Sequence, residues 1–162
     1  MKKMLIAVAA VLLLLSSAVA SEIQTDPADP SYHNERYGFT VKWAPGAYRV
    51  YEADNGDGIT VSDGHGLEMR VWGSLDQDVF GLTEKDFYQR ARDSRAEYSV
   101  VNTSQRWYVV SGRRGNNIYY VKSFYTDDAV MTMSIEYPAA LKSRYDSFVK
   151  EAVKGFLPGR KF

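Results

Sequence analysis

The stretch ADNGDGITVSDGHG, residues 53–66, gathers acidic and glycine residues of the kind that bind metal ions. An EF-hand calcium loop needs acidic or amide side chains at positions 1, 3 and 5, a glycine at position 6 and a glutamate at position 12. With Gly58 at position 6, positions 1 and 12 fall on Ala53 and Gly64. Both end ligands are missing, so the spacing does not predict a calcium site.

The same stretch contains the dipeptides that are typical of tight hairpin turns. Asn55-Gly56 and Asp57-Gly58 lie between the strand-like segments AYRVYE and ITV, and Asp63-Gly64 and His65-Gly66 precede LEMRVW. Asn-Gly and Asp-Gly pairs accept the positive φ angles of such turns. We therefore interpret the stretch as two turns in which the glycines, Gly58 included, hold positive φ, and we predict no metal or cofactor site.

The chain has two histidines, His33 and His65. His65 follows Asp63 by two residues, so a hydrolase site assembled in space around His65 stays open as an alternative. Gly-x-Ser-x-Gly, the motif of a nucleophilic serine, is absent from the sequence. We expect His65 to be an exposed turn residue and predict no catalytic residue.

Two arginines, Arg113 and Arg114, lie in the segment Ser111–Asn117 between two apolar segments. Exposed loop arginines are common on ordinary surfaces, so a hairpin loop is the simpler interpretation. Contact with an anion or a partner remains the alternative, because arginine on a loop can bind carboxylates. The tyrosines fall mainly in strand-like segments, where packing is a more common role than lining a groove.

Residues 1–20 have the pattern of a signal peptide. Lys2 and Lys3 precede an unbroken apolar run over residues 4–15, and Ala18-Val19-Ala20 forms an A-x-A cleavage site. The run is shorter than the roughly 20 apolar residues that span a bilayer. The sequence therefore predicts cleavage before Ser21, a periplasmic or secreted protein, and no stable membrane insertion afterwards.

Charge and cysteine content exclude several classes of function. The chain has 20 basic and 20 acidic side chains, and residues 1–20 contain two of the lysines, so the mature chain would be slightly acidic. Nucleic-acid binding needs a basic field, which this composition does not provide. The absence of cysteine rules out thiol catalysis, disulfides and cysteine-based zinc sites.

Strand patterns occupy most of the remaining chain. Residues 37–43, 67–71 and 131–137 alternate apolar and polar side chains, which predicts strands with one buried face. Residues 107–110 and 118–125 are almost continuously apolar or aromatic, as in central strands covered on both faces. Weaker strand patterns cover residues 48–51 and 98–101.

Two segments have helical patterns. Thr83 is a good N-cap with Asp86 at the third helical position, and Leu82 can pack on Phe87, so we expect a helix that ends near Arg95. Residues 141–156 carry one apolar stripe at helical spacing, followed by glycine and proline stop signals.

Together these elements predict an α+β fold, with a mostly antiparallel sheet of about six to eight strands covered by two main helices. Residues 21–35 carry two prolines and few large apolar residues, so we expect a flexible N-terminal arm there. Residues 36–162 would then form a single α+β domain.

Several segments resemble small exported bacterial proteins of unknown function with the PsbP-like and DcrB-like α/β/α sandwich fold. The segments that carry the resemblance are RYGFTVKW (36–43), NGDGI (55–59), WYVVSG (107–112), IYYVK (118–122) and the entry to the last helix (137–149). The resemblance covers nearly the whole mature chain and includes no catalytic signature.

Relatives with this fold dock on other proteins, in photosystem accessory and chaperone-like roles. The resemblance therefore implies a non-enzymatic exported binding or protein-interaction domain of the bacterial envelope. A protein partner or a small ligand is expected, without cofactor or metal. The hydrolase around His65 remains the alternative.

Overall fold

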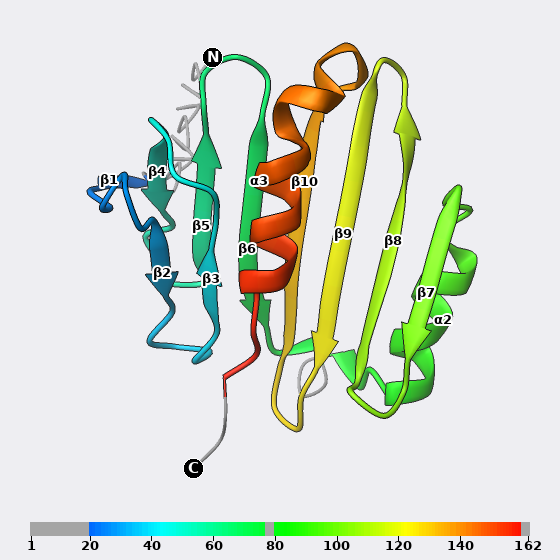
Figure 1. Ribbon diagram of the computed structural model, residues 1–162. Helices are drawn as coiled ribbons and strands as arrows, with labels where there is room; N and C mark the ends of the chain where they lie inside the picture. The colour runs from blue at the N-terminus through cyan, green and yellow to red at the C-terminus, as the bar shows by residue number, and fades with distance from the viewer. Residues whose placement is uncertain (1–19, 77–79, 160–162) are drawn as a thin grey trace, which may run out of the picture.

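The computed structural model describes residues 20–76 and 80–159, and in this part of the chain eight strands form one antiparallel sheet. The strand order is β1-β4-β5-β6-β10-β9-β8-β7 (Figure 1). The signal peptide expected over residues 1–20 lies outside the described residues, except for Ala20. The strands of the main sheet are β1 (Ser21–Ile23), β4 (Arg49–Glu52), β5 (Gly58–Ser62), β6 (Glu68–Ser74), β7 (Tyr98–Asn102), β8 (Trp107–Arg114), β9 (Asn117–Tyr125) and β10 (Val130–Pro138).

The expected alternation is clearest in β10, which lies between β6 and β9. Met131, Met133 and Ile135 are buried in the main core, whereas Thr132 and Ser134 are only partly buried on the other face. Antiparallel pairing with β6 sets Met133 opposite Val71, so the buried side chains of both strands face the same core.

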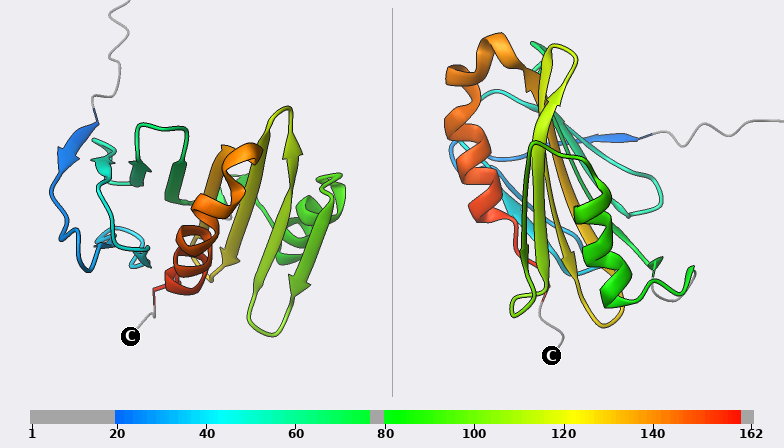
Figure 2. Two further views of the ribbon diagram at one scale, coloured as in Figure 1. Left: turned by 45° about the horizontal axis from the view of Figure 1, so that its top comes forward. Right: turned by 90° about the vertical axis from the view of Figure 1, so that its right-hand side faces the viewer.

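Two helices cover opposite faces of this sheet (Figure 2). Helix α3 (Lys142–Gly155) follows a short 3₁₀ turn, η1 (Ala139–Leu141), and buries Tyr145, Phe148 and Ala152 against the main core. Helix α2 (Glu84–Asp93) packs on β7 and β8 on the other face. The predicted α+β class, with an antiparallel sheet and two main helices, is confirmed.

The start of α2 also agrees with its sequence pattern. The Thr83 side chain accepts a hydrogen bond from the Asp86 amide, and the Asp86 side chain accepts one from the Thr83 amide, which completes a capping box. Leu82 packs against the cluster that contains Phe87. The helix ends at Asp93, two residues before the expected end.

The structure differs from the flexible arm expected over residues 21–35. β1 pairs with β4 at one edge of the main sheet, and β2 (Ser31–His33) pairs with β3 (Thr40–Lys42) in a second, two-stranded sheet. Between β2 and β3 the chain buries Asn34, a residue that is 1% exposed. Strand pairing with distant segments, which local composition does not show, orders this region.

No helix in the described part of the chain has the length and apolar character needed to cross a membrane.

Candidate functional site

An open trough runs along β5 on the face of the sheet away from α3. Val50, Ile59, Val61 and Val71 are buried in the core that α3 covers, so the residues between them on β4, β5 and β6 face the other way. Helix α2, which covers part of that second face, packs on β7 and β8 and leaves β4–β6 uncovered. The outward residues Tyr51, Gly58, Thr60, Arg70 and Trp72 form what we call the β4–β6 trough. Together with neighbouring residues, among them Ala20 directly before the predicted cleavage point, they line a cavity of about 320 Å³.

Strand register explains the shape of the trough. Tyr51 pairs with Thr60, and Thr60 pairs with Arg70, so these three side chains form one row across the sheet. Gly58 pairs with Trp72 in the next row. The central strand thus contributes small residues, and the large side chains stand on β4 and β6, whose backbones are about 10 Å apart at two strand spacings.

The turn over residues 53–57 closes one end of the trough and holds the aspartate that suggested a metal loop. The Asp57 carboxylate accepts hydrogen bonds from Arg36 Nη1 at 2.7 Å, the Tyr37 hydroxyl at 3.2 Å and Asn55 Nδ2 at 2.5 Å. Burial raises the pKa of Tyr37, and the nearby Asp57 carboxylate raises it further. Asp57 therefore fixes the turn to the segment that precedes β3.

The second sheet supports the same turn through Asn34. Asn34 Nδ2 donates to the Gly56 carbonyl at 2.9 Å and to the Tyr32 hydroxyl at 3.0 Å, while Asn34 Oδ1 accepts from the Tyr37 amide at 2.7 Å. The Tyr32 hydroxyl in turn donates to Glu52 Oε1 at 2.5 Å. Burial and this hydrogen bond to Glu52 raise the pKa of Tyr32 to about 12.

One glycine in residues 53–66, Gly58, has a different role from the one that the sequence predicts. Gly56, Gly64 and Gly66 hold positive φ, as expected for turns. Gly58 does not: it begins β5, and a Cβ atom added there would lie 1.9 Å from the Val71 carbonyl oxygen. The expectation of positive φ at Gly58 is wrong, and the close approach of the β6 backbone is the reason for glycine there.

Asp63 and His65 lie in the second turn, between β5 and β6. The Asp63 side chain, 8% exposed, accepts hydrogen bonds from the Tyr145 hydroxyl at 2.7 Å and from the amides of His65 and Leu67. Burial opposes ionisation of Asp63, but these hydrogen bonds outweigh it and hold the pKa of Asp63 below its ordinary value.

An open pocket of about 450 Å³ includes Ser62, Asp63 and His65 in its lining. The His65 side chain is exposed, and no hydrogen bond to its imidazole is found among residues 20–76 and 80–159. The Ser62 hydroxyl accepts from the Gly64 amide at 3.2 Å. The three residues are therefore brought near one another without the hydrogen bonds that join nucleophile, base and carboxylate in a hydrolase.

The arginines of the expected hairpin loop are at the end of β8. Gly115, with φ of 59°, turns the chain directly from β8 into β9. The Arg114 guanidinium lies 3.6 Å from Glu136 Oε2 and 5.1 Å from the Tyr119 ring centroid. The hairpin is confirmed, and Arg114 packs along the neighbouring strands.

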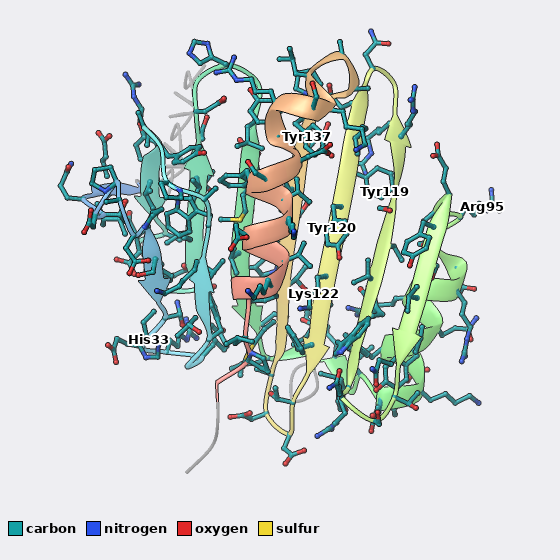
Figure 3. The ribbon with its side chains drawn as sticks, in the orientation of Figure 1. His33, Arg95, Tyr119, Tyr120, Lys122 and Tyr137 are labelled. Carbon is teal, nitrogen blue, oxygen red and sulfur yellow. The ribbon has the colours of Figure 1, made fainter. Side chains whose placement is uncertain are left out.

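A lysine and a tyrosine with shifted pKa values lie on β9 beside α3 (Figure 3). Lys122 Nζ donates to the Val153 carbonyl at 3.0 Å and lies 4.8 Å from the Phe124 ring centroid. Burial lowers the pKa of Lys122 and raises the pKa of Tyr120 to about 12. Lys122 therefore stabilises the last turn of α3, where a cation favours the helix dipole. His33, also labelled in Figure 3, is exposed on β2.

Sequence reasoning missed the β4–β6 trough. Its members alternate with the buried residues of their strands, so each one alone looks like an ordinary outward position. Trp72 could have indicated the trough from the sequence. Residues 67–71 alternate apolar and polar side chains, so a polar residue is expected at position 72, where a large aromatic side chain stands instead.

In the described residues no three histidine, aspartate or glutamate side chains converge as metal ligands. No protein-family model and no curated protein matches this chain.

Proposed function

We propose that this protein is an exported binding domain of the bacterial envelope and that the β4–β6 trough is its ligand surface. The observation that carries the proposal is Trp72, which is 37% exposed beside a cavity on the sheet face opposite α3, in a part of that face that α2 does not cover. Indole side chains are enriched at binding surfaces because they combine a large apolar face with an N–H donor. An exposed tryptophan in a hollow is therefore a better indicator of binding than of packing.

The chemistry around the trough favours binding over catalysis. The nearest carboxylate in the turn, Asp57, is held by Arg36, Tyr37 and Asn55. Arg70 lies 2.7 Å from Glu68 in an exposed ion pair. The Asp57 carboxylate and the Arg70 guanidinium are thus held by neighbouring side chains and stabilise the local structure. A general acid or base must instead lie within hydrogen-bond reach of the substrate proton that it transfers.

The proposal also includes export of the protein and a PsbP-like or DcrB-like sandwich fold. The positive, apolar and A-x-A segments of residues 1–20 support secretion. An eight-stranded antiparallel sheet with α3 on one face and α2 on the other supports the PsbP-like and DcrB-like sandwich (Figure 2). Fold likeness alone carries little weight for function, so the proposal depends on the trough.

The experiment compares retention of envelope components by wild-type protein, by a Tyr51→Ala/Trp72→Ala variant and by Trp107→Phe. Trp107 is a partly buried tryptophan on β8 and is not part of the trough. Each immobilised mature protein is incubated with periplasmic extract, and bound small molecules and proteins are identified by mass spectrometry. We expect a component that wild type and Trp107→Phe retain and the double variant loses. Equal retention by all three proteins would refute the trough as the ligand surface.

A further inference from the structure

We infer that the β4–β6 trough binds a neutral carbohydrate, an inference that depends on the proposed binding function. Aromatic side chains stand on both sides of the trough, and a threonine hydroxyl lies on the strand between them. Tyr51 and Trp72 stand on either side of β5, and Thr60 lies between Tyr51 and Arg70 in the row. Aromatic faces are electron-rich, so they attract the positively polarised C–H groups on the flat side of a sugar ring.

The polar groups of the trough suit hydroxyl groups. The Thr60 and Tyr51 hydroxyls each donate and accept, and the Trp72 indole nitrogen donates. Within the described part of the chain, these three side-chain groups make no hydrogen bond to another protein group. A sugar hydroxyl also donates and accepts, so a polyol can satisfy all three groups at once.

Charge argues against a phosphate or nucleotide ligand. Among the described residues that line the cavity, Arg70 is the one cationic side chain, and its guanidinium already lies beside Glu68. Asp57 at the closed end is paired with Arg36. The side-chain charges around the trough therefore nearly cancel. Cleavage before Ser21 would add one amino group next to the position of Ala20, whereas anion sites concentrate several positive charges or free backbone amides.

Geometry argues against an extended peptide or a lipid chain. Peptides that add a strand need an unpaired sheet edge, but β5 is paired on both sides, with β4 and β6. A lipid chain needs an enclosed apolar cavity, and the trough is a shallow hollow on the sheet surface. A cavity of about 320 Å³ is at the small end of ligand pockets and suits one or two rings.

Calorimetric titration with maltotriose and with the trimer of N-acetylglucosamine tests the inference, with glucose 6-phosphate and trialanine as contrasting probes. We expect saturable binding of at least one neutral trisaccharide, with quenching of tryptophan fluorescence. Trp72→Ala should weaken binding by about tenfold or more, the scale of one aromatic contact. Thr60→Val, which keeps the shape and removes the hydroxyl, should weaken it several-fold. Trp107→Phe should bind like wild type and keep the quenching.

Thermal melts of each variant separate loss of binding from loss of folding, and Thr60→Val keeps the test informative if Trp72→Ala unfolds. The inference fails if neither trisaccharide binds, if glucose 6-phosphate or trialanine binds more tightly, or if Trp72→Ala and Thr60→Val bind sugar like wild type. If no sugar binds but wild type still retains an envelope component that Tyr51→Ala/Trp72→Ala loses, the binding function stands and the carbohydrate inference falls. If both experiments fail, the trough is not a binding site.

Discussion

Tyr145 donates its hydroxyl hydrogen to Asp63 over 2.7 Å and so joins the last helix to the turn after β5. The two residues are 82 positions apart in the chain. Burial raises the pKa of Tyr145, and its hydrogen bond to Asp63 raises it further, while the same bond lowers the pKa of Asp63. The bond is formed with the Asp63 carboxylate ionised, so its strength depends on pH.

Asp63→Ala should lower the free energy of unfolding by about 1–3 kcal/mol at pH 7, because two amides and a buried hydroxyl lose their acceptor. The folded-state pKa of Asp63 is lowered, so its stabilisation is complete above the ordinary aspartate pKa of about 3.9 and is lost as the pH falls through the lower folded value. Urea unfolding at pH 7 and pH 3 measures the difference between wild type and variant, which should shrink at pH 3. Tyr145→Phe, which removes one of the three hydrogen bonds, should cost less; an unchanged difference at both pH values would contradict the prediction.

Gly58→Ala should destabilise the protein by about 3 kcal/mol or more, at the upper end of overpacking effects, because the new Cβ meets the β6 backbone. Gly56→Ala is the matched control: Gly56 has positive φ, but nothing lies within 4 Å of an added Cβ. It should cost about 1 kcal/mol through backbone strain alone. Denaturant titration measures both losses, and a loss for Gly58→Ala no larger than that for Gly56→Ala would contradict the close approach of the β6 backbone at Gly58.

Phe148→Ala should cost about 3–5 kcal/mol, as for other buried phenylalanines. Phe148 is 2% exposed, and its ring centroid lies 5.2 Å from that of Tyr48. The exposed Phe80, at 76%, provides the control, and Phe80→Ala should change the free energy of unfolding by less than about 0.5 kcal/mol. A loss below about 1 kcal/mol for Phe148→Ala would show that α3 does not cover the core in solution.

Millimolar calcium should not stabilise the protein by more than about 0.4 kcal/mol, the effect of a ligand at a concentration near its dissociation constant. The Asp57 carboxylate is engaged by Arg36, Tyr37 and Asn55, and the spacing lacks the end ligands of a calcium loop. Melting curves with calcium and with chelator measure this. A shift of many degrees that Asp57→Ala abolishes would establish a metal site in residues 53–66.

N-terminal sequencing of the protein recovered from the periplasm or the medium should give Ser-Glu-Ile-Gln-Thr, which corresponds to the predicted cleavage before Ser21. Such a chain keeps the whole of β1 and its pairing with β4. A version that begins at Thr25 should melt at a lower temperature, because it lacks β1. Recovery of protein that retains Met1 in the membrane would contradict the cleavage prediction.

The elements that could be predicted from sequence are those with a strong local signal. The alternation over residues 131–137 and the capping pair Thr83 and Asp86 each require only neighbours in sequence. Asn34 was missed because its partners, Gly56 and Tyr32, become neighbours only when the second sheet forms. The trough was missed for the same reason, since Tyr51, Thr60 and Trp72 converge only through the register of three strands.

The pairing of β6 with β10 has a consequence for how the chain folds. Ser74 at the end of β6 pairs with Val130 at the start of β10, and these two strands are central in the main sheet although Ser74 and Val130 are 56 positions apart in the chain. Contacts between such distant segments form slowly, because the intervening chain must first be closed into a loop. The hairpins that build the trough can pair early, whereas β6 keeps an open hydrogen-bonding edge until synthesis reaches β10. That edge is the part of the nascent chain most exposed to aggregation, and a premature stop within α2 to β9 would leave it permanently unpaired.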